Sequence, residues 1–166
     1  MFSKSLISSV ALCLGLALQA SAHAIITPTL GVSGTAVRAD VQCPSAASEC
    51  RTINIPQNID SLQAAIANQA GIFNVTITNF NGGVNGSCQI ASALVDPTGT
   101  GNFASAQSAT MILNGDLAPT VVGYQPLTVQ LPAGLECAGG ASADKCLVSF
   151  TTAGSFGNCV VVQQSA

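Results

Sequence analysis

Short runs of alternating hydrophobic and polar residues dominate this chain. The clearest run is 74–80 (NVTITNF), in which Val75, Ile77 and Asn79 fall on one face and β-branched residues prevail. A period of two residues is typical of a half-buried β-strand. Five further segments have the same character and are expected to be strands, namely residues 90–95, 110–113, 127–131, 147–151 and 159–163.

Turn-forming residues separate these predicted strands. Clusters of Gly, Pro, Asn and Asp occur at 81–83, 96–99, 114–116 and 139–140. Such residues favour the backbone conformations of tight turns. Short strands at this regular spacing predict a mainly β protein, built as an immunoglobulin-like sandwich of two sheets.

One short helix is predicted near residues 60–70. Asp60 or Ser61 is suited to cap its start, and Gly71 is suited to end it. The positions with helical spacing are Leu62, Ala65, Ile66 and Gln69. There is no internal repeat or long linker, so residues 23–166 are expected to form a single domain.

The first 22 residues have the features of a secretory signal peptide. Lys4 supplies the positive charge, residues 6–18 are apolar, and Ala20-Ser21-Ala22 fits the small-residue rule for cleavage. The apolar run is shorter than the roughly 20 residues that a membrane-spanning helix needs. The mature protein is therefore expected to be secreted and to have no membrane attachment after cleavage.

The chain contains few charged residues, which make up only 7% of the sequence. Without Lys4, three basic residues (Arg38, Arg51 and Lys145) stand against seven acidic ones, which gives a net charge of −4. The three basic residues form no cluster in the sequence, which argues against nucleic acids and anionic membranes as partners. Ser, Thr, Asn and Gln are expected to form most of the surface.

The cysteines predict a disulfide framework. One of the seven, Cys13, lies in the signal peptide, and six would remain: Cys43, Cys50, Cys88, Cys137, Cys146 and Cys159. An even number in a secreted chain favours three bridges, with 15 connectivities open. Cys137 with Cys146 is the preferred pair because the two flank a short loop; zinc binding is disfavoured because there is no CxxC pair. Asn74 and Asn85 begin glycosylation motifs, Asn-Val-Thr and Asn-Gly-Ser.

His23 is the only histidine, and it directly follows the predicted cleavage site. As first residue of the mature chain, its imidazole and the α-amino group could chelate Cu(II) together. A second imidazole is missing, so a carboxylate, an amide or a ligand from a partner would have to complete the site. The acidic candidates are Asp40, Asp96, Asp116, Glu136 and Asp144. Cleavage after Ala20 would place His23 third, which also suits Cu(II), whereas cleavage after Ala24 would remove it.

Other catalytic chemistries have little support. There is no GxSxG motif and no nucleotide-binding glycine pattern. Asp96 with Asp116, or Asp116 with Glu136, could be paired as in a glycosidase, but such loop acids are more often turn residues. Trp is absent and Tyr124 is the only Tyr, so a stacking platform for sugars is not expected, and Tyr124 is predicted to pack in a buried or half-buried position.

Several segments resemble a family of fungal secreted proteins that are expressed in the appressorium of powdery mildews and other plant pathogens. They are the Ala-His-Ala-Ile junction at 22–25, Gly86-Ser87-Cys88-Gln89, residues 96–101 (DPTGTG), residues 127–132 before Cys137, the strand at 146–148 and the ending 154–164 (GSFGNCVVVQQ). The resemblance implies a role at a host surface or at the fungus's own wall. Some members have been likened to lytic polysaccharide monooxygenases, in which case His23 alone would take the position of the copper-binding N-terminal histidine.

Two functional hypotheses remain open. The first is a non-catalytic secreted protein that binds cell-wall polysaccharide or a host surface component, for which no catalytic residue or cofactor is assigned. The alternative is a copper-dependent oxidative enzyme acting on a chitin-type substrate, or a copper-binding protein without turnover, with His23 as the metal ligand. The low charge and the incomplete ligand set favour the first hypothesis.

Overall fold

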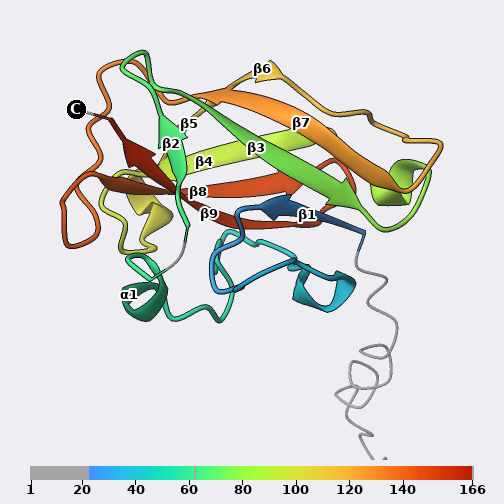
Figure 1. Cartoon of the computed structure of the whole chain (residues 1–166), viewed down its shortest axis with the longest axis horizontal. Coiled ribbons are helices and arrows are strands. Elements are labelled where there is room, and N and C mark those ends of the chain that lie inside the picture. Colours follow the sequence, from blue (N-terminus) through green and yellow to red (C-terminus); the bar gives the residue numbers. More distant parts are fainter. Residues whose placement is uncertain (1–22, 62, 166) are drawn as a thin grey trace, which may run out of the picture.

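The computed structural model describes residues 23–61 and 63–165 of the chain (Figure 1). The predicted signal peptide, residues 1–22, lies outside this part. Two sheets face each other. The first has the order β1 (Ala24–Thr27), β3 (Ile72–Asn79), β7 (Gly123–Gln130) and β6 (Thr110–Leu113). The second has the order β2 (Ala65–Ala67), β9 (Gly157–Gln164), β8 (Lys145–Thr152), β4 (Ile90–Asp96) and β5 (Gln107–Ser108).

The strand order is that of an immunoglobulin-like sandwich. In the immunoglobulin lettering, the strands β1, β3, β7 and β6 of the first sheet correspond to A, B, E and D. In the second sheet, β9, β8, β4 and β5 correspond to G, F, C and C′, and β2 lies beside G. The first strand is divided: β1 pairs with β3 in one sheet, whereas β2 pairs parallel to β9 in the other. All other strand pairs are antiparallel. The predicted two-sheet sandwich is confirmed.

All six strands predicted from alternation are present. In β3 the predicted inward face is correct, because Val75, Ile77 and Asn79 are buried. The sequence did not reveal β1, β2 or β5, which have only two to four residues. Such short strands carry too few positions for an alternation to be recognised.

The helix predicted at 60–70 is wrong in position. The α-helix of the described residues, α1, is a single turn at Ile55–Asn58, where the Asn54 side chain accepts a hydrogen bond from the Gln57 N–H at 3.3 Å. Asp60 does not cap a helix, since its carboxylate binds Lys145 Nζ at 2.7 Å.

Residues 65–67 form β2 instead, because pairing with β9 outweighs the weak helical spacing of this segment. Ala65 and Ala67 point inward, and Ile66 is 59% exposed. No helix in the described residues has the length and apolarity needed to span a membrane.

Apolar side chains fill the space between the two sheets. The largest fully buried side chains include Phe73, Phe150, Ile77 and Leu127. A second, smaller cluster lies on the outer face of β8 and β9, where Leu30 and Ile59 pack with Leu147 and Val161. The described residues between β1 and β2, 28–61 and 63–64, therefore include a third layer over the second sheet (Figure 1).

Two disulfides are present. Cys137–Cys146 is the predicted pair, and it closes a short loop with a sequence separation of 9. Cys50–Cys159 joins the third layer to β9 with a sequence separation of 109. The expected third bridge is not formed, because Cys43 is exposed whereas Cys88 is buried in the main core, and both are free thiols. Burial and the nearby Asp116 raise the pKa of Cys88 to about 11, so this thiol stays protonated at neutral pH.

We predict that the two bridges contribute unequally to stability. Replacing Cys50 and Cys159 by Ser should lower the free energy of unfolding by roughly 4–5 kcal/mol, because that bridge closes a long loop in the unfolded chain. Replacing Cys137 and Cys146 by Ser should cost roughly 2–3 kcal/mol. Denaturant unfolding of both double variants measures the difference, and an equal or reversed cost would contradict the proposed role of the long-range bridge.

Candidate functional site

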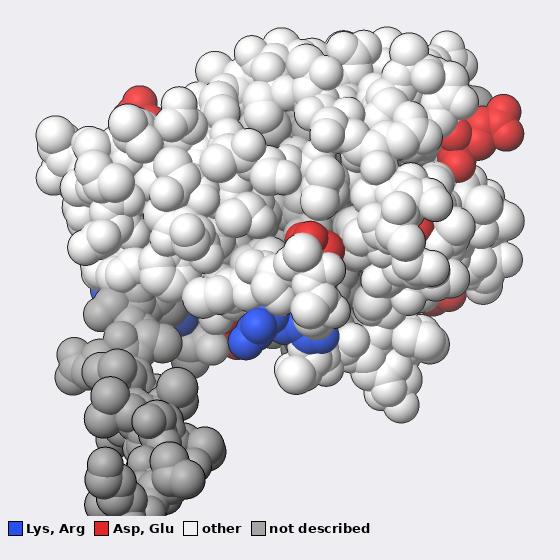
Figure 2. Space-filling view, turned by 180° about the vertical axis from the view of Figure 1, so that it is seen from behind, with Lys and Arg blue, Asp and Glu red and all other residues white. Residues whose placement is uncertain are grey.

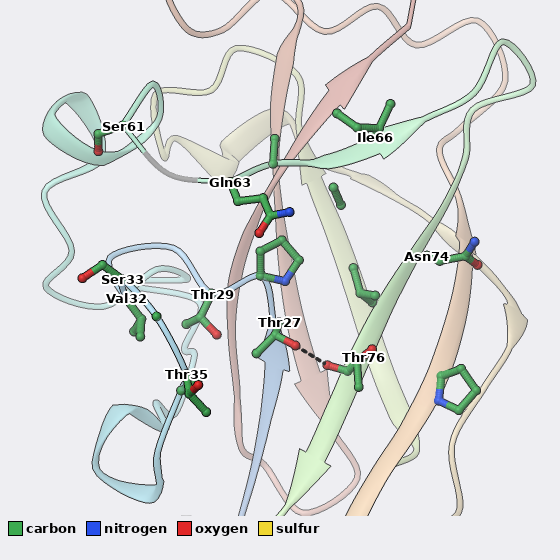
Figure 3. A pocket seen from close by; sticks show the side chains of 17 residues that line it. Thr27, Thr29, Val32, Ser33, Thr35, Ser61, Gln63, Ile66, Asn74 and Thr76 are labelled. Atoms are coloured by element: carbon green, nitrogen blue, oxygen red, sulfur yellow. Dashed lines mark hydrogen bonds between the residues drawn. The ribbon is translucent and has the colours of Figure 1, made fainter.

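An open groove of about 940 Å³ lies at the place where the chain leaves the first sheet. The pairing of β1 with β3 ends at Thr27 and Thr76, and the chain enters the second sheet only at β2. Figure 3 looks into this groove. The groove volume falls within the range of about 300–1,000 Å³ found for ligand sites.

Three parts of the fold form the walls of the groove. One is the turn after β1, where Thr29 Oγ1 donates a hydrogen bond to the carbonyl of Ile26 at 2.7 Å. The second comes from the residues before and within β2. The third is the outer face of β3 and β7, where Asn74 is exposed and its Oδ1 accepts from Thr128 Oγ1 at 2.9 Å. The polar side chains that line it are Thr27, Thr29, Ser33, Thr35, Ser61, Gln63, Asn74 and Thr76 (Figure 3).

The lining combines polar and apolar side chains and carries no charge in its described part. The other described lining residues are Pro28, Val32, Gly34, Ala36, Ala64, Ala65, Ile66, Val75 and Pro126, so no Asp, Glu, His, Cys, Lys, Arg or Tyr belongs to the described lining. Figure 2, which views the molecule from the side opposite to Figure 1, shows few charged groups there as well. Hydroxyl and amide groups both donate and accept hydrogen bonds. The groove is therefore equipped to bind a neutral, hydroxylated ligand, and its described lining contains no Asp, Glu, His, Lys or Cys that would act as general acid or base or activate its hydroxyl groups.

A buried asparagine fixes the strand that leads into the groove. Asn158 of β9 is fully buried, and its side chain reaches across to β1 in the opposite sheet. Its Oδ1 accepts from the N–H of Ile26 at 2.8 Å, and its Nδ2 donates to the carbonyl of Ile26 at 2.8 Å. Just after the groove turn, the N–H of Leu30 donates to the carbonyl of Cys159 at 2.9 Å. The turn between these two anchors is thus held at both ends.

His23 lies at the other end of β1 and is 7% exposed. Its ring packs edge-on against Phe156, with a centroid distance of 4.6 Å. Nδ1 is hydrogen-bonded to the side-chain amide of Asn81, whose oxygen accepts from Arg38 Nη2 at 2.7 Å. Because Arg38 takes the amide oxygen, the Asn81 NH₂ group faces the imidazole, which assigns Nδ1 as acceptor and places the ring proton on Nε2.

These contacts do not fit the predicted copper site. The imidazole nitrogen nearest to the backbone, Nδ1, would share a chelate ring with an α-amino group, and it is occupied by Asn81. Burial and the positive charge of Arg38 lower the pKa of His23, and the same charge opposes a bound cation. In the described part of the chain, no three His, Cys, Asp or Glu residues gather to hold a metal ion.

The acidic residues considered as additional ligands are dispersed. Four are engaged with other groups: Asp40 with the N–H of Val37, Asp96 with Thr98 and Gly101, Asp116 with Gln125, and Asp144 with Ser142 and Gln163. Glu136 is exposed at a second, smaller groove of about 310 Å³. These acidic residues thus have other partners or lie at another groove, and the role of His23 as a metal ligand stays a prediction.

The two predicted glycosylation positions lie in different environments. Asn74 lines the groove, and a glycan attached to it would stand over the groove opening. Asn85 is exposed in the short turn of 3₁₀ helix Val84–Gly86. Whether the two asparagines are modified remains a prediction.

Tyr124 is placed differently from the sequence prediction. It was expected to be buried or half-buried, but its side chain is 79% exposed on β7. The error has a physical reason: Tyr124 occupies an outward position of a strand whose inward positions include Leu127 and Val129. Its exposure follows from the register of β7, which the sequence alone did not determine.

No known protein family, characterised protein or solved structure was found to match this chain. The resemblance to appressorium-expressed proteins is therefore still a prediction. The groove residues themselves were missed by sequence analysis, because isolated Ser, Thr and Gln residues far apart in the chain carry no motif. The one signal available was the low charge of the chain as a whole.

We predict that His23 makes stability depend on pH. The fold lowers the pKa of the imidazole through burial and the charge of Arg38, whereas the unfolded chain binds a proton near the ordinary pKa of 6.5. The free energy of unfolding should therefore decrease as the pH falls from 7.5 to 5.5. In His23→Gln this part of the decrease should disappear, as measured by urea unfolding at both pH values. An identical pH dependence in wild type and variant would contradict the neutral, buried state of the ring.

Proposed function

We propose that this protein is a non-catalytic binding protein for a neutral polysaccharide, acting at a cell wall or host surface outside the cell. The observation that carries the proposal is the groove beside β1 and β3. Its lining offers several hydroxyl and amide groups and no ionisable side chain in the part that the structure describes. A neutral polymer of sugars is the ligand class that matches this chemistry, since each ring presents several hydroxyl groups.

The absence of charge in the lining also separates the proposal from other ligand classes. Phosphorylated, sulfated or uronic acid ligands would be expected to meet Lys or Arg side chains, and none belongs to the described lining. Oxidative or hydrolytic cleavage is not part of the proposal, because the groove supplies no acid–base pair and His23 lies outside it.

The extracellular location is inferred from two features. Disulfide bridges persist in oxidising compartments, and two are present here. The N-terminal residues have the pattern of a signal peptide. The burial of His23 and Ala24, and the pairing of Ala24 with Asn79, concern the position of cleavage instead, and they favour a mature chain that keeps both residues. The resemblance to fungal appressorium proteins supports a wall or host surface as the place of action.

Binding to insoluble polysaccharide tests the proposal. Protein made without N-glycosylation, so that Asn74 is unmodified, is mixed with chitin, β-glucan and cellulose and then sedimented. We expect binding to at least one of them. Gln63→Ala and Asn74→Ala should each weaken this binding by about threefold to tenfold, since each removes a hydrogen-bonding group worth about 0.5–1.5 kcal/mol.

Gln69→Ala serves as the matched control. Gln69 is also an exposed glutamine, but it lies at the smaller groove near Glu136. The control variant should bind as the wild type does. Failure of the wild type to bind any neutral polysaccharide, or an equal loss in Gln69→Ala, would refute the assignment of the ligand to the larger groove.

A further inference from the structure

Among the described residues, no contact accounts for the placement of the Tyr124 side chain at the surface. The side chain is 79% exposed, and no hydrogen bond to its hydroxyl group is found. A solitary tyrosine on an open sheet face buries no apolar area within the fold and so adds little to stability. A ring in this position is available to a ligand.

The strand register places Tyr124 next to the groove. Thr76 of β3 pairs with Pro126 of β7, and both residues line the groove. Two positions further along the same strands, Thr78 pairs with Tyr124. Residues two apart point to the same face and are separated by about 6.6–6.8 Å. The ring therefore stands on the same outer face, one pair of residues beyond the rim of the groove.

In the other direction along the sheet, this face continues with the same chemistry. Asn74 pairs with Thr128, and Ile72 pairs with Gln130. Asn74 is exposed, and Thr128 and Gln130 are half-buried. Hydroxyl and amide groups, with the apolar Ile72 and Pro126 between them, thus run along β3 and β7 as far as one aromatic ring.

We propose that Tyr124 is a stacking subsite that extends the groove into a binding track for several consecutive sugar rings of a neutral polysaccharide chain. This inference rests on the proposed function of the groove. Pyranose rings present an apolar C–H face that packs on an aromatic ring, while their equatorial hydroxyl groups bind to amides and hydroxyls beside it. The combination of a polar groove with one ring at its end selects a polymer rather than a single sugar, because a short ligand fills the groove without reaching Tyr124.

The composition of the chain provides a specific probe. Trp is absent and Tyr124 is the only tyrosine, so the tyrosine fluorescence of the protein reports this one side chain. Oligosaccharides of increasing length, prepared from the polysaccharide that binds best, are titrated into protein made without N-glycosylation. Affinity is measured by calorimetry, and protection of the fluorescence from acrylamide quenching is measured in parallel.

We expect affinity to rise with chain length and protection from acrylamide to appear only with the longer oligosaccharides. Tyr124→Ala should bind the shortest ligands as the wild type does and the longer ones about three- to tenfold more weakly. Tyr124→Phe should keep the affinity, because stacking uses the ring and not the hydroxyl group. Val121→Ala, which shortens another exposed side chain just before β7, is the matched control and should bind all lengths as the wild type does.

The two proposals fail in different ways. Binding of long oligosaccharides with no change in fluorescence quenching, and with equal affinity in Tyr124→Ala, would overturn the stacking subsite and leave the groove assignment standing. An equal loss in Val121→Ala would also overturn it, since the effect would then not be specific to the ring. Absence of binding at every chain length would overturn the proposed function and the subsite together.

Discussion

The side chain of Asn158 joins the two sheets of this protein. It is fully buried and forms hydrogen bonds with both the N–H and the carbonyl of Ile26, as a neighbouring strand would do. β1 is an edge strand of the first sheet and β9 lies next to the edge strand β2 of the second, so these bonds fix the two sheets against each other at this side of the sandwich. A buried amide of this kind is costly unless all its groups are paired, and here Nδ2 also donates to the Cys159 carbonyl at 3.1 Å.

The groove depends on this arrangement. Immediately after Thr27 the chain turns away from β3 and begins the long segment that leads to β2, whose residues 28–61 the Leu30 contact and the Cys50–Cys159 bridge hold against β9. Because β1 ends early and β2 begins late, the edge of β3 between them is left open, and its outward side chains remain available. Asn158, Leu30 and the Cys50–Cys159 bridge thus account both for the position of the groove wall that follows β1 and for the opening of the groove beside β3.

The fold could be predicted from the sequence further than the site could. Long alternating runs such as that in β3 specify strands by themselves, and the turn residues between them specify a sandwich. The segment 65–67 shows the limit, because a weak helical spacing was overruled by pairing with β9, in which Ala65 pairs with Val162 far along the chain. The cysteine count suggested three bridges, but the fold buries Cys88 and exposes Cys43. The exposure of Tyr124 and the lining of the groove depend on register and on contacts between distant residues, which no local pattern encodes.

His23 illustrates how a single conspicuous residue is reinterpreted by its surroundings. As a sequence feature it pointed to copper, yet in the fold it accepts a hydrogen bond from Asn81 and packs on Phe156 beside a positive charge. The most direct test of the account is an NMR titration of the labelled protein with a neutral oligosaccharide. We predict chemical-shift changes concentrated at Thr27, Gln63, Asn74 and Thr76, with little change at His23 and Asn81. Changes centred on His23, or on the smaller groove near Gln69, would contradict it.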